Sequence, residues 1–180
     1  MENLYWNTVS PLLKEILIEL MQEELFLPFR LVGGTALSLQ IGHRMSVDID
    51  MFTDADYESI DFDKIRTFLK NNYDFYSTSP VEIVAFGTYF KIGYSKANCI
   101  KLDLYYTDPY IDAIQEVSTI RMATVPEIIA MKLDVILRGG RKKDFWDLHY
   151  FLDKYSIDEM ISFFEKRYPH NDDFVKIKEM

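Results

Sequence analysis

Residues 30–52 read RLVGGTALSLQIGHRMSVDIDMF, and they contain the two strongest structural signals of the sequence. An apolar, strand-like run ends at Val32, the pair Gly33-Gly34 follows it, and a short apolar segment comes next. Paired glycines after a strand let backbone N–H groups approach a phosphate closely, and the start of the following helix adds the positive end of its dipole. The first half of the stretch therefore predicts a phosphate-binding turn.

The second half of the stretch alternates acidic with apolar side chains. A period of two places Asp48 and Asp50 on one face of a strand, where both carboxylates can bind the same Mg²⁺. Three apolar residues alternate with them and are expected to form the buried face: Val47, Ile49 and Met51. Acidic pairs at this spacing also arise by chance in a chain with 29 acidic residues, so half-exposed strand acids without a metal are the alternative. The glycine turn upstream favours a site for nucleotidyl transfer.

The composition is that of a packed globule. The 180 residues are 48% hydrophobic, which allows one domain with a real core, or one domain and a small helical appendage. No apolar run reaches the roughly 18 residues that span a bilayer, and no signal peptide is recognisable, so we expect a cytoplasmic protein without a membrane partner. The single cysteine, Cys99, cannot form an internal disulfide. A net charge of −9 argues against tight general binding to nucleic acid, although one local basic cluster exists: Arg138, Arg141, Lys142 and Lys143.

Capping signals and hydrophobic periodicity predict an α/β (α+β) chain. We expect helices over residues 11–25, 35–41, 61–69, 124–137, 143–155 and 156–167. We expect strands over residues 29–32, 47–52, 82–86, 88–94 and 98–106, the last three as an antiparallel meander. This order predicts an α/β core over residues 1–120 and a helical region over residues 121–180 that packs on it.

A second polar constellation lies in the C-terminal part. Lys132 falls in a helix that is apolar over much of its surface, where a lysine needs a partner or a ligand. Asp144 and Asp147 follow, one turn apart, at the start of the next helix. Acids in a first turn also stabilise the helix dipole, so a structural role is the alternative. Four aromatic residues with helical spacing are expected in the core: Phe145, Trp146, Phe151 and Tyr155.

Two blocks of sequence resemble one family. Residues 33–39 (GGTALSL) with residues 43–52 (HRMSVDIDMF) resemble the signature of the AbiEii/AbiGii-type nucleotidyltransferases, which belong to the DNA polymerase beta-like nucleotidyltransferase superfamily. Lys132 with residues 138–148 (RGGRKKDFWDL) looks like that family's lysine and its Lys-Asp-x-x-Asp-Leu motif. The blocks appear in the family's order, and the resemblance spans roughly residues 30–151.

The resemblance implies a polymerase beta-like core with a mixed or antiparallel sheet, and it assigns roles to named residues. A third carboxylate on a neighbouring strand completes the metal site in such enzymes, and Asp103 is the candidate; an aspartate paired with a lysine is the alternative. The implied ligands of Mg²⁺ or Mn²⁺ are Asp48, Asp50 and Asp103, and Lys132 joins them as catalytic. The implied nucleotide-binding residues are Gly33, Gly34, Thr35, Arg44, Ser46, Lys132, Asp144 and Asp147.

The implied activity is transfer of a nucleoside monophosphate from a nucleoside triphosphate to an acceptor hydroxyl. In relatives the acceptor is RNA, notably tRNA, or a protein side chain. The implied biology is a toxin that a cognate antitoxin neutralises, or a component of abortive infection against phage. Two other classes stay open: a catalytically silent nucleotide-binding or protein-interaction module, and a metal-dependent phosphatase or nuclease that uses the same acids.

Overall fold

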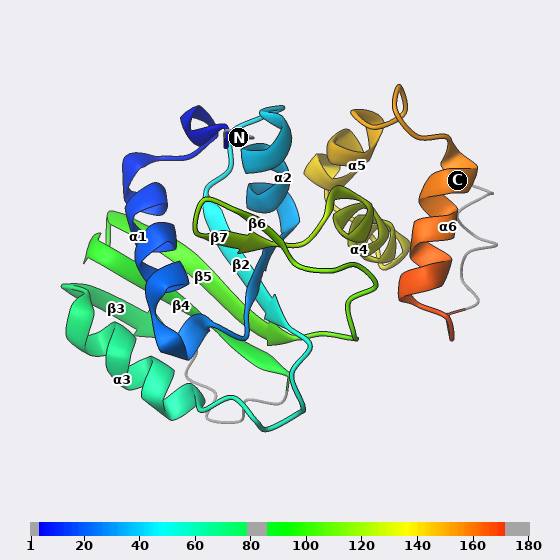
Figure 1. The fold of residues 1–180 in the computed structure, drawn as a ribbon. Helices are drawn as coiled ribbons and strands as arrows, with labels where there is room; N and C mark the ends of the chain where they lie inside the picture. Colours follow the sequence, from blue (N-terminus) through cyan, green and yellow to red (C-terminus); the bar gives the residue numbers. More distant parts are fainter. Residues whose placement is uncertain (1–3, 79–85, 172–180) are drawn as a thin grey trace. The chain divides into compact units, whose positions relative to one another are not determined.

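The computed structural model describes residues 4–78 and 86–171 (Figure 1). The chain divides into two compact units, which we describe separately. The first comprises Met1–Thr107 and Gln115–Met122, and the second comprises Asp108–Ile114 and Ala123–Met180. The division into domains at residue 120 stays a prediction. No helix in residues 4–78 and 86–171 is long and apolar enough to cross a membrane.

A seven-stranded sheet forms the first unit, in the order β3-β4-β5-β2-β1-β7-β6. The strands are β1 (Arg30–Val32), β2 (Asp48–Thr53), β3 (Phe75–Thr78), β4 (Gly87–Ser95), β5 (Asn98–Tyr106), β6 (Gln115–Val117) and β7 (Ile120–Met122). Strands β2 and β5 pair in parallel, as do β1 and β7, and the other neighbours are antiparallel. The predicted α/β class with a mixed sheet is confirmed.

Two of the three helices of the first unit begin where local capping signals place them, whereas the helix predicted over residues 35–41 begins at Gly33, without a side-chain cap. They are α1 (Pro11–Gln22), α2 (Gly33–Ile41) and α3 (Phe62–Asn72), with 3₁₀ turns at Trp6–Thr8 and Glu24–Phe26. The Ser10 hydroxyl accepts the Leu13 N–H at 3.1 Å and starts α1, while the Asp61 carboxylate accepts the Lys64 N–H at 2.9 Å and starts α3. The predicted first helix is too long, because α1 ends at Gln22 and a 3₁₀ turn follows.

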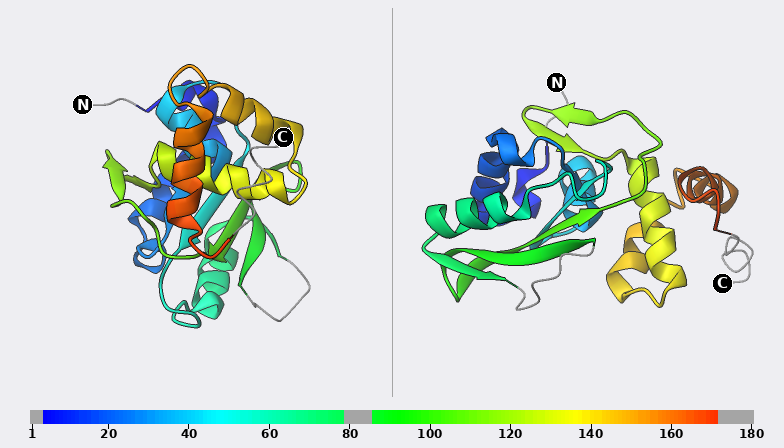
Figure 2. Two further views of the ribbon diagram at one scale, coloured as in Figure 1. Left: turned by 90° about the vertical axis from the view of Figure 1, so that its right-hand side faces the viewer. Right: turned by 90° about the horizontal axis from the view of Figure 1, so that it is seen from below.

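Helix α1 lies across the sheet and buries its apolar stripe there (Figures 1 and 2). Leu13, Leu17 and Leu20 are fully buried. The Arg121 guanidinium on β7 donates to the backbone oxygens of Met21 at 2.8 Å and of Phe26 at 3.1 Å, which ties the end of α1 to the sheet. The apolar residues of β2 and β5 therefore face α1, and their polar residues occupy the opposite face of the sheet.

Three strands escaped prediction. Strands β6 and β7 have three residues each, which is too short for an alternation to be recognised in the sequence, and β3 is a four-residue strand without a buried face. Strands β4 and β5 confirm the predicted antiparallel pair over residues 88–94 and 98–106. The predicted strand over residues 82–86 falls almost entirely outside the described residues.

The second unit is helical and contains α4 (Val125–Leu137), α5 (Lys142–His149) and α6 (Ile157–Arg167). Helix α4 packs against both α5 and α6. Two expectations for this unit are wrong: α5 ends at His149 instead of Tyr155, and Phe145 and Trp146 are 50% and 59% exposed rather than in the core. The inward face of α5 is occupied by the buried Asp144 and Asp147, so the residues between them point to solvent.

Candidate active site

The acid pair and the third carboxylate share one face of the sheet. The burial of β2 alternates, with Ile49 and Met51 buried and Asp48 and Asp50 half-exposed. In the parallel register of β2 and β5, Asp50 lies opposite Asp103. Val47 was expected on the buried face but precedes β2 and is exposed, because the strand starts only at Asp48. Two non-adjacent segments of the chain thus bring three carboxylates to neighbouring positions.

A lysine lies among these acids. Lys101 is the register partner of Asp48, and its Nζ donates a hydrogen bond to the Asp103 carboxylate. Partial burial would lower the pKa of the Lys101 ammonium, but the bond to Asp103 and the charges of Asp103, Asp50 and Asp48 outweigh it and raise that pKa. The aspartate–lysine pairing that was the alternative for Asp103 is therefore present, and its lysine, Lys101, was not among the predicted site residues.

The donor types at this face fit a hard divalent ion, which prefers carboxylate oxygens. Within residues 4–78 and 86–171, no three acidic, histidine or cysteine side chains stand close enough to enclose a metal as they are placed. The charges of three carboxylates nevertheless act on one cation, the Lys101 ammonium. Asp48, Asp50 and Asp103 could hold a metal ion once the Lys101–Asp103 bond opens.

The glycine turn touches both an acid and an arginine of the site. Gly33 has φ +67°, and a Cβ placed on it would lie 2.6 Å from Asp50 Oδ2. A Cβ on Gly34 would lie 2.5 Å from Arg44 Nη2. Gly33 therefore requires glycine for its backbone conformation and its space, whereas a side chain at Gly34 would displace the end of the Arg44 side chain. The start of α2 lies between the Asp50 carboxylate and the Arg44 guanidinium.

Two hydroxyl groups join the glycine turn to the acid strand. Thr35 Oγ1 lies 2.8 Å from Ser46 Oγ, and Thr35 Oγ1 also donates to the backbone oxygen of Asp48. Both side chains are buried. Contacts of Thr35 and Ser46 with a nucleotide stay a prediction, and in the structure the two hydroxyls fix the position of β2 against the start of α2.

The Lys132 constellation forms a buried charge cluster in the second unit. Lys132 Nζ lies 2.6 Å from Asp144 Oδ1 and 2.7 Å from Asp147 Oδ2, and the three side chains are 7%, 1% and 0% exposed. Asp144 Oδ2 also accepts the Arg141 backbone N–H at 3.1 Å. Burial would raise the pKa of the Asp144 carboxyl, but the Lys132 hydrogen bond and charge, with Arg141, hold it below its usual value. Helices α4 and α5 are thus joined by paired charges.

The family model described as the nucleotidyl transferase AbiEii toxin of type IV toxin–antitoxin systems matches residues 15–178. The chain belongs to the AbiEii nucleotidyltransferase toxin family. It is a nucleotidyltransferase, as the two sequence blocks indicated. The matched range contains the acid face of the first unit and the charge cluster of the second.

One curated protein is similar in sequence to this AbiEii-family chain, and several solved structures are similar to it in fold. The chain is 27% identical over 159 residues to the uncharacterized protein aq_aa25 of Aquifex aeolicus, covering 84% of this chain and 72% of that protein. JHP933 of Helicobacter pylori has a similar fold, with a TM-score of 0.61 and 20% identity, over 92% of this chain and 78% of that one. MenT4, a nucleotidyltransferase toxin of Mycobacterium tuberculosis, aligns with a TM-score of 0.50 and 13% identity, over 76% of this chain and 54% of that one.

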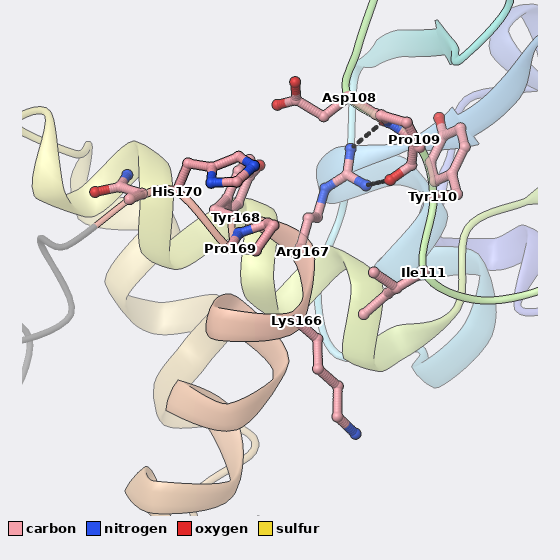
Figure 3. A pocket seen from close by; sticks show the side chains of 10 residues that line it. Asp108, Pro109, Tyr110, Ile111, Lys166, Arg167, Tyr168, Pro169 and His170 are labelled. Atoms are coloured by element: carbon pink, nitrogen blue, oxygen red, sulfur yellow. Dashed lines mark hydrogen bonds between the residues drawn. The ribbon is translucent and has the colours of Figure 1, made fainter.

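The second unit of this AbiEii-family protein also contains a hollow of about 540 Å³, lined by residues 108–111 and 166–171 (Figure 3). Arg167 spans its base, donating to the backbone oxygens of Pro109 at 3.2 Å and of Asp108 at 3.4 Å. The same guanidinium pairs with the buried Glu127 on α4. Burial raises the pKa of the Glu127 carboxyl despite this ion pair. Arg167 thus holds the loop, α4 and α6 together.

Proposed function

We propose that this nucleotidyltransferase moves a nucleoside monophosphate from a nucleoside triphosphate to an acceptor hydroxyl, with a divalent metal ion held by Asp48, Asp50 and Asp103. The observation that carries the proposal is the β2–β5 register, which sets Asp50 opposite Asp103 beside the Gly33-Gly34 turn. Pyrophosphate leaves as the acceptor oxygen bonds to the α-phosphorus.

The triphosphate would bind at the start of α2. The side chain of the N-cap residue, Val32, makes no capping hydrogen bond to the first turn of this helix. Its backbone N–H groups at Gly33 and Gly34 carry the positive end of the helix dipole. The Arg44 guanidinium beside Gly34 adds a full positive charge at the same place. Such a combination favours an anion, and a phosphate fits because the glycines leave the backbone accessible.

Metal binding would be the task of the acid face. Asp50 is the central ligand, because it touches Gly33 and lies opposite Asp103. When bound, Mg²⁺ or Mn²⁺ supplies neutralisation of the triphosphate charge and lowers the pKa of the acceptor hydroxyl. The protein's own contribution is to position the two reacting groups in line, which is the larger part of catalysis in phosphoryl transfer.

Lys132, Asp144 and Asp147 stay our candidates for nucleotide contacts on the strength of the family motif. In the structure the lysine charge is balanced by the two aspartates, so a phosphate contact of Lys132 requires sharing its ammonium with them. The cluster would then orient the lysine rather than leave it mobile.

We propose RNA, tRNA included, as the acceptor in preference to a protein side chain. Arg138, Arg141 and Lys142 are exposed around the start of α5, next to the exposed Trp146. Lys142 Nζ lies 4.9 Å from the centre of the Trp146 ring. Positive charge interleaved with exposed aromatic rings is the pattern with which proteins bind single-stranded nucleic acid. Membership of a type IV toxin–antitoxin family further implies a cognate antitoxin that counteracts the enzyme.

One observation favours a second candidate, a catalytically silent nucleotide-binding module. The Lys101 ammonium already neutralises Asp103, and such a pair could replace the metal permanently. A protein of this kind would bind nucleotide without turnover and without any need for a divalent ion.

Labelled nucleoside triphosphates separate the two candidates. The protein is incubated with each triphosphate, Mg²⁺ or Mn²⁺, and either total RNA or cell protein, and transfer of label to the acceptor is followed. Asp50→Asn should lose activity by about 10³-fold or more, since a central metal ligand is removed. Asp56→Asn is the matched control, because Asp56 is an exposed loop acid beyond β2. Wild-type protein that binds nucleotide but labels no acceptor with either metal would favour the silent module.

A further inference from the structure

We propose that the Lys101 ammonium occupies the cation position of the acidic face in the metal-free protein, and that a divalent ion must displace it, so that Lys101 sets the metal affinity of the enzyme. The inference rests on the proposed function, because it assigns the metal to Asp48, Asp50 and Asp103. Lys101 lies outside the two sequence blocks that resemble the family.

The pairing of β2 with β5 places the Lys101 ammonium beside the acidic side chains of the site. Lys101 and Asp103 are two residues apart on β5 and share one face of the sheet, so the ammonium reaches the Asp103 carboxylate directly. On the neighbouring strand β2, Asp48 lies opposite Lys101 and Asp50 lies opposite Asp103. One ammonium group therefore faces three carboxylates from two strands.

Strand β4 supports the ammonium from the other side. Tyr89 lies opposite Asp103 in the β4–β5 register, and Lys101 Nζ is 5.4 Å from the centre of the Tyr89 ring. A cation at this distance from an aromatic ring is attracted by it. The ammonium thus lies between an aromatic ring on β4 and the acids of β2 and β5, and both the ring and the acids attract a cation.

The Lys101 side chain is more exposed than the Asp103 side chain, so the ammonium can be exchanged for a metal ion. The Asp103 side chain is 12% exposed, whereas the Lys101 side chain is 40% exposed. The carboxylate is therefore held in place by the sheet, while the lysine enters from the solvent side and can swing back into water on its flexible stem. Three carboxylates attract a doubly charged ion more strongly than they attract an ammonium group, so the metal ion displaces Lys101 at sufficient concentration.

A structural pair offers the competing explanation of the Lys101–Asp103 bond. In that case the pair would persist with metal bound, and Lys101 would only orient Asp103. The β2–β5 register sets Lys101 opposite Asp48 while its ammonium bonds to Asp103, so the ammonium lies beside acids of both strands, which indicates a cation shared by the cluster rather than a bond to one partner.

Calorimetric titration with MnCl₂ alone, without nucleotide, tests the proposal on the full chain. Lys101→Met should bind Mn²⁺ about tenfold more tightly than wild type, the factor expected when a unit positive charge about 5 Å from a divalent ion is removed in a largely water-exposed site. Its thermal midpoint should be lower without metal, and should rise more when Mn²⁺ is added. Lys101→Arg, which keeps the charge, should stay near the wild-type affinity.

Lys91 offers a matched control for the change in net charge. It lies directly opposite Lys101 in the β4–β5 register, on the same face, and it is exposed. Lys91→Met should change Mn²⁺ affinity by less than about threefold, since the field of an exposed charge is screened by solvent. Asp50→Asn should abolish binding and so locate the ion at the acids. Lys101→Gln replaces Lys101→Met if circular dichroism shows that the methionine variant does not fold.

The outcomes separate the two proposals. Equal or weaker Mn²⁺ binding by Lys101→Met, with wild-type binding that Asp50→Asn abolishes, would overturn the role of Lys101 and leave the metal site standing. Absence of Mn²⁺ binding in both wild type and Lys101→Met would overturn the metal site and with it this inference. Binding that appears only when Lys101 is replaced would support the displacement most directly.

Discussion

Replacement of Lys132 by methionine should lower the stability of the second unit, because it leaves two buried carboxylates without their cation. Lys132 Nζ lies 2.6 Å from Asp144 and 2.7 Å from Asp147, and both aspartates are essentially inaccessible to solvent. Removal of one partner from a buried ion pair typically costs about 3–5 kcal/mol. For a chain of this size each kcal/mol lowers the thermal midpoint by about 2–4 °C, so a fall of roughly 6–20 °C is expected.

The assay is thermal and guanidinium unfolding, followed by circular dichroism at 222 nm, where the helices of the second unit contribute strongly. Lys154→Met is the matched control, since Lys154 is an exposed lysine of the same unit, and its substitution should stay within about 0.5 kcal/mol. The triple variant Lys132→Met, Asp144→Asn, Asp147→Asn removes the uncompensated charges and should recover more than half of the loss. An amide oxygen at position 144 can still accept the Arg141 backbone N–H, so that hydrogen bond is kept.

The loss of stability caused by Lys132→Met should depend on pH in a definite direction. The folded-state pKa of Asp144 lies below its usual value, so the Lys132 interaction stabilises the protein at pH values above the unfolded pKa of about 3.8, and this stabilisation is lost as the pH falls through the folded pKa. The difference in stability between wild type and Lys132→Met should therefore shrink as the pH falls below about 4. A loss of stability below about 1 kcal/mol at pH 7, or a difference that grows as the pH falls, would show that the Lys132 charge does not stabilise the two buried aspartates.

Two further predictions concern the glycine turn and the basic cluster. Gly33→Ala should cost about 1–3 kcal/mol and also weaken Mn²⁺ binding in calorimetry, because it combines a positive φ with a Cβ against Asp50. Gly139→Ala has the positive φ without any atom within 4 Å and should leave Mn²⁺ binding intact; equal metal affinities in the two variants would contradict the clash. Neutralising Arg138, Lys142 and Lys143 to Gln should weaken RNA binding in filter-binding assays and flatten its log–log salt slope by about two. The same change at the exposed Lys64, Lys70 and Lys96 should leave RNA binding and its salt slope unchanged. If neutralising Arg138, Lys142 and Lys143 does not change the salt slope, the basic cluster does not bind RNA.

Features that depend only on neighbouring residues could be predicted from the sequence. The Ser10, Asp61 and Thr124 caps start their helices within a residue of the expected positions, because a cap is a contact over three residues. The alternation in β2 placed Asp48 and Asp50 on one face for the same local reason. The two motif blocks were sufficient to indicate the family, since a glycine turn and an acid pair are read along one short segment.

Features that depend on pairing between distant segments could not be predicted from the sequence and are seen only in the folded protein. Only the β2–β5 register could bring Asp103 opposite Asp50 and place Lys101 among the acids, because strand registers follow from packing against α1 and from hydrogen bonding across the sheet. The apolar spacing of α5 suggested buried Phe145 and Trp146, yet Lys132 on α4 attracts Asp144 and Asp147 inward and leaves the two rings in solvent. A buried ammonium must be neutralised, and that requirement outweighed the hydrophobic pattern.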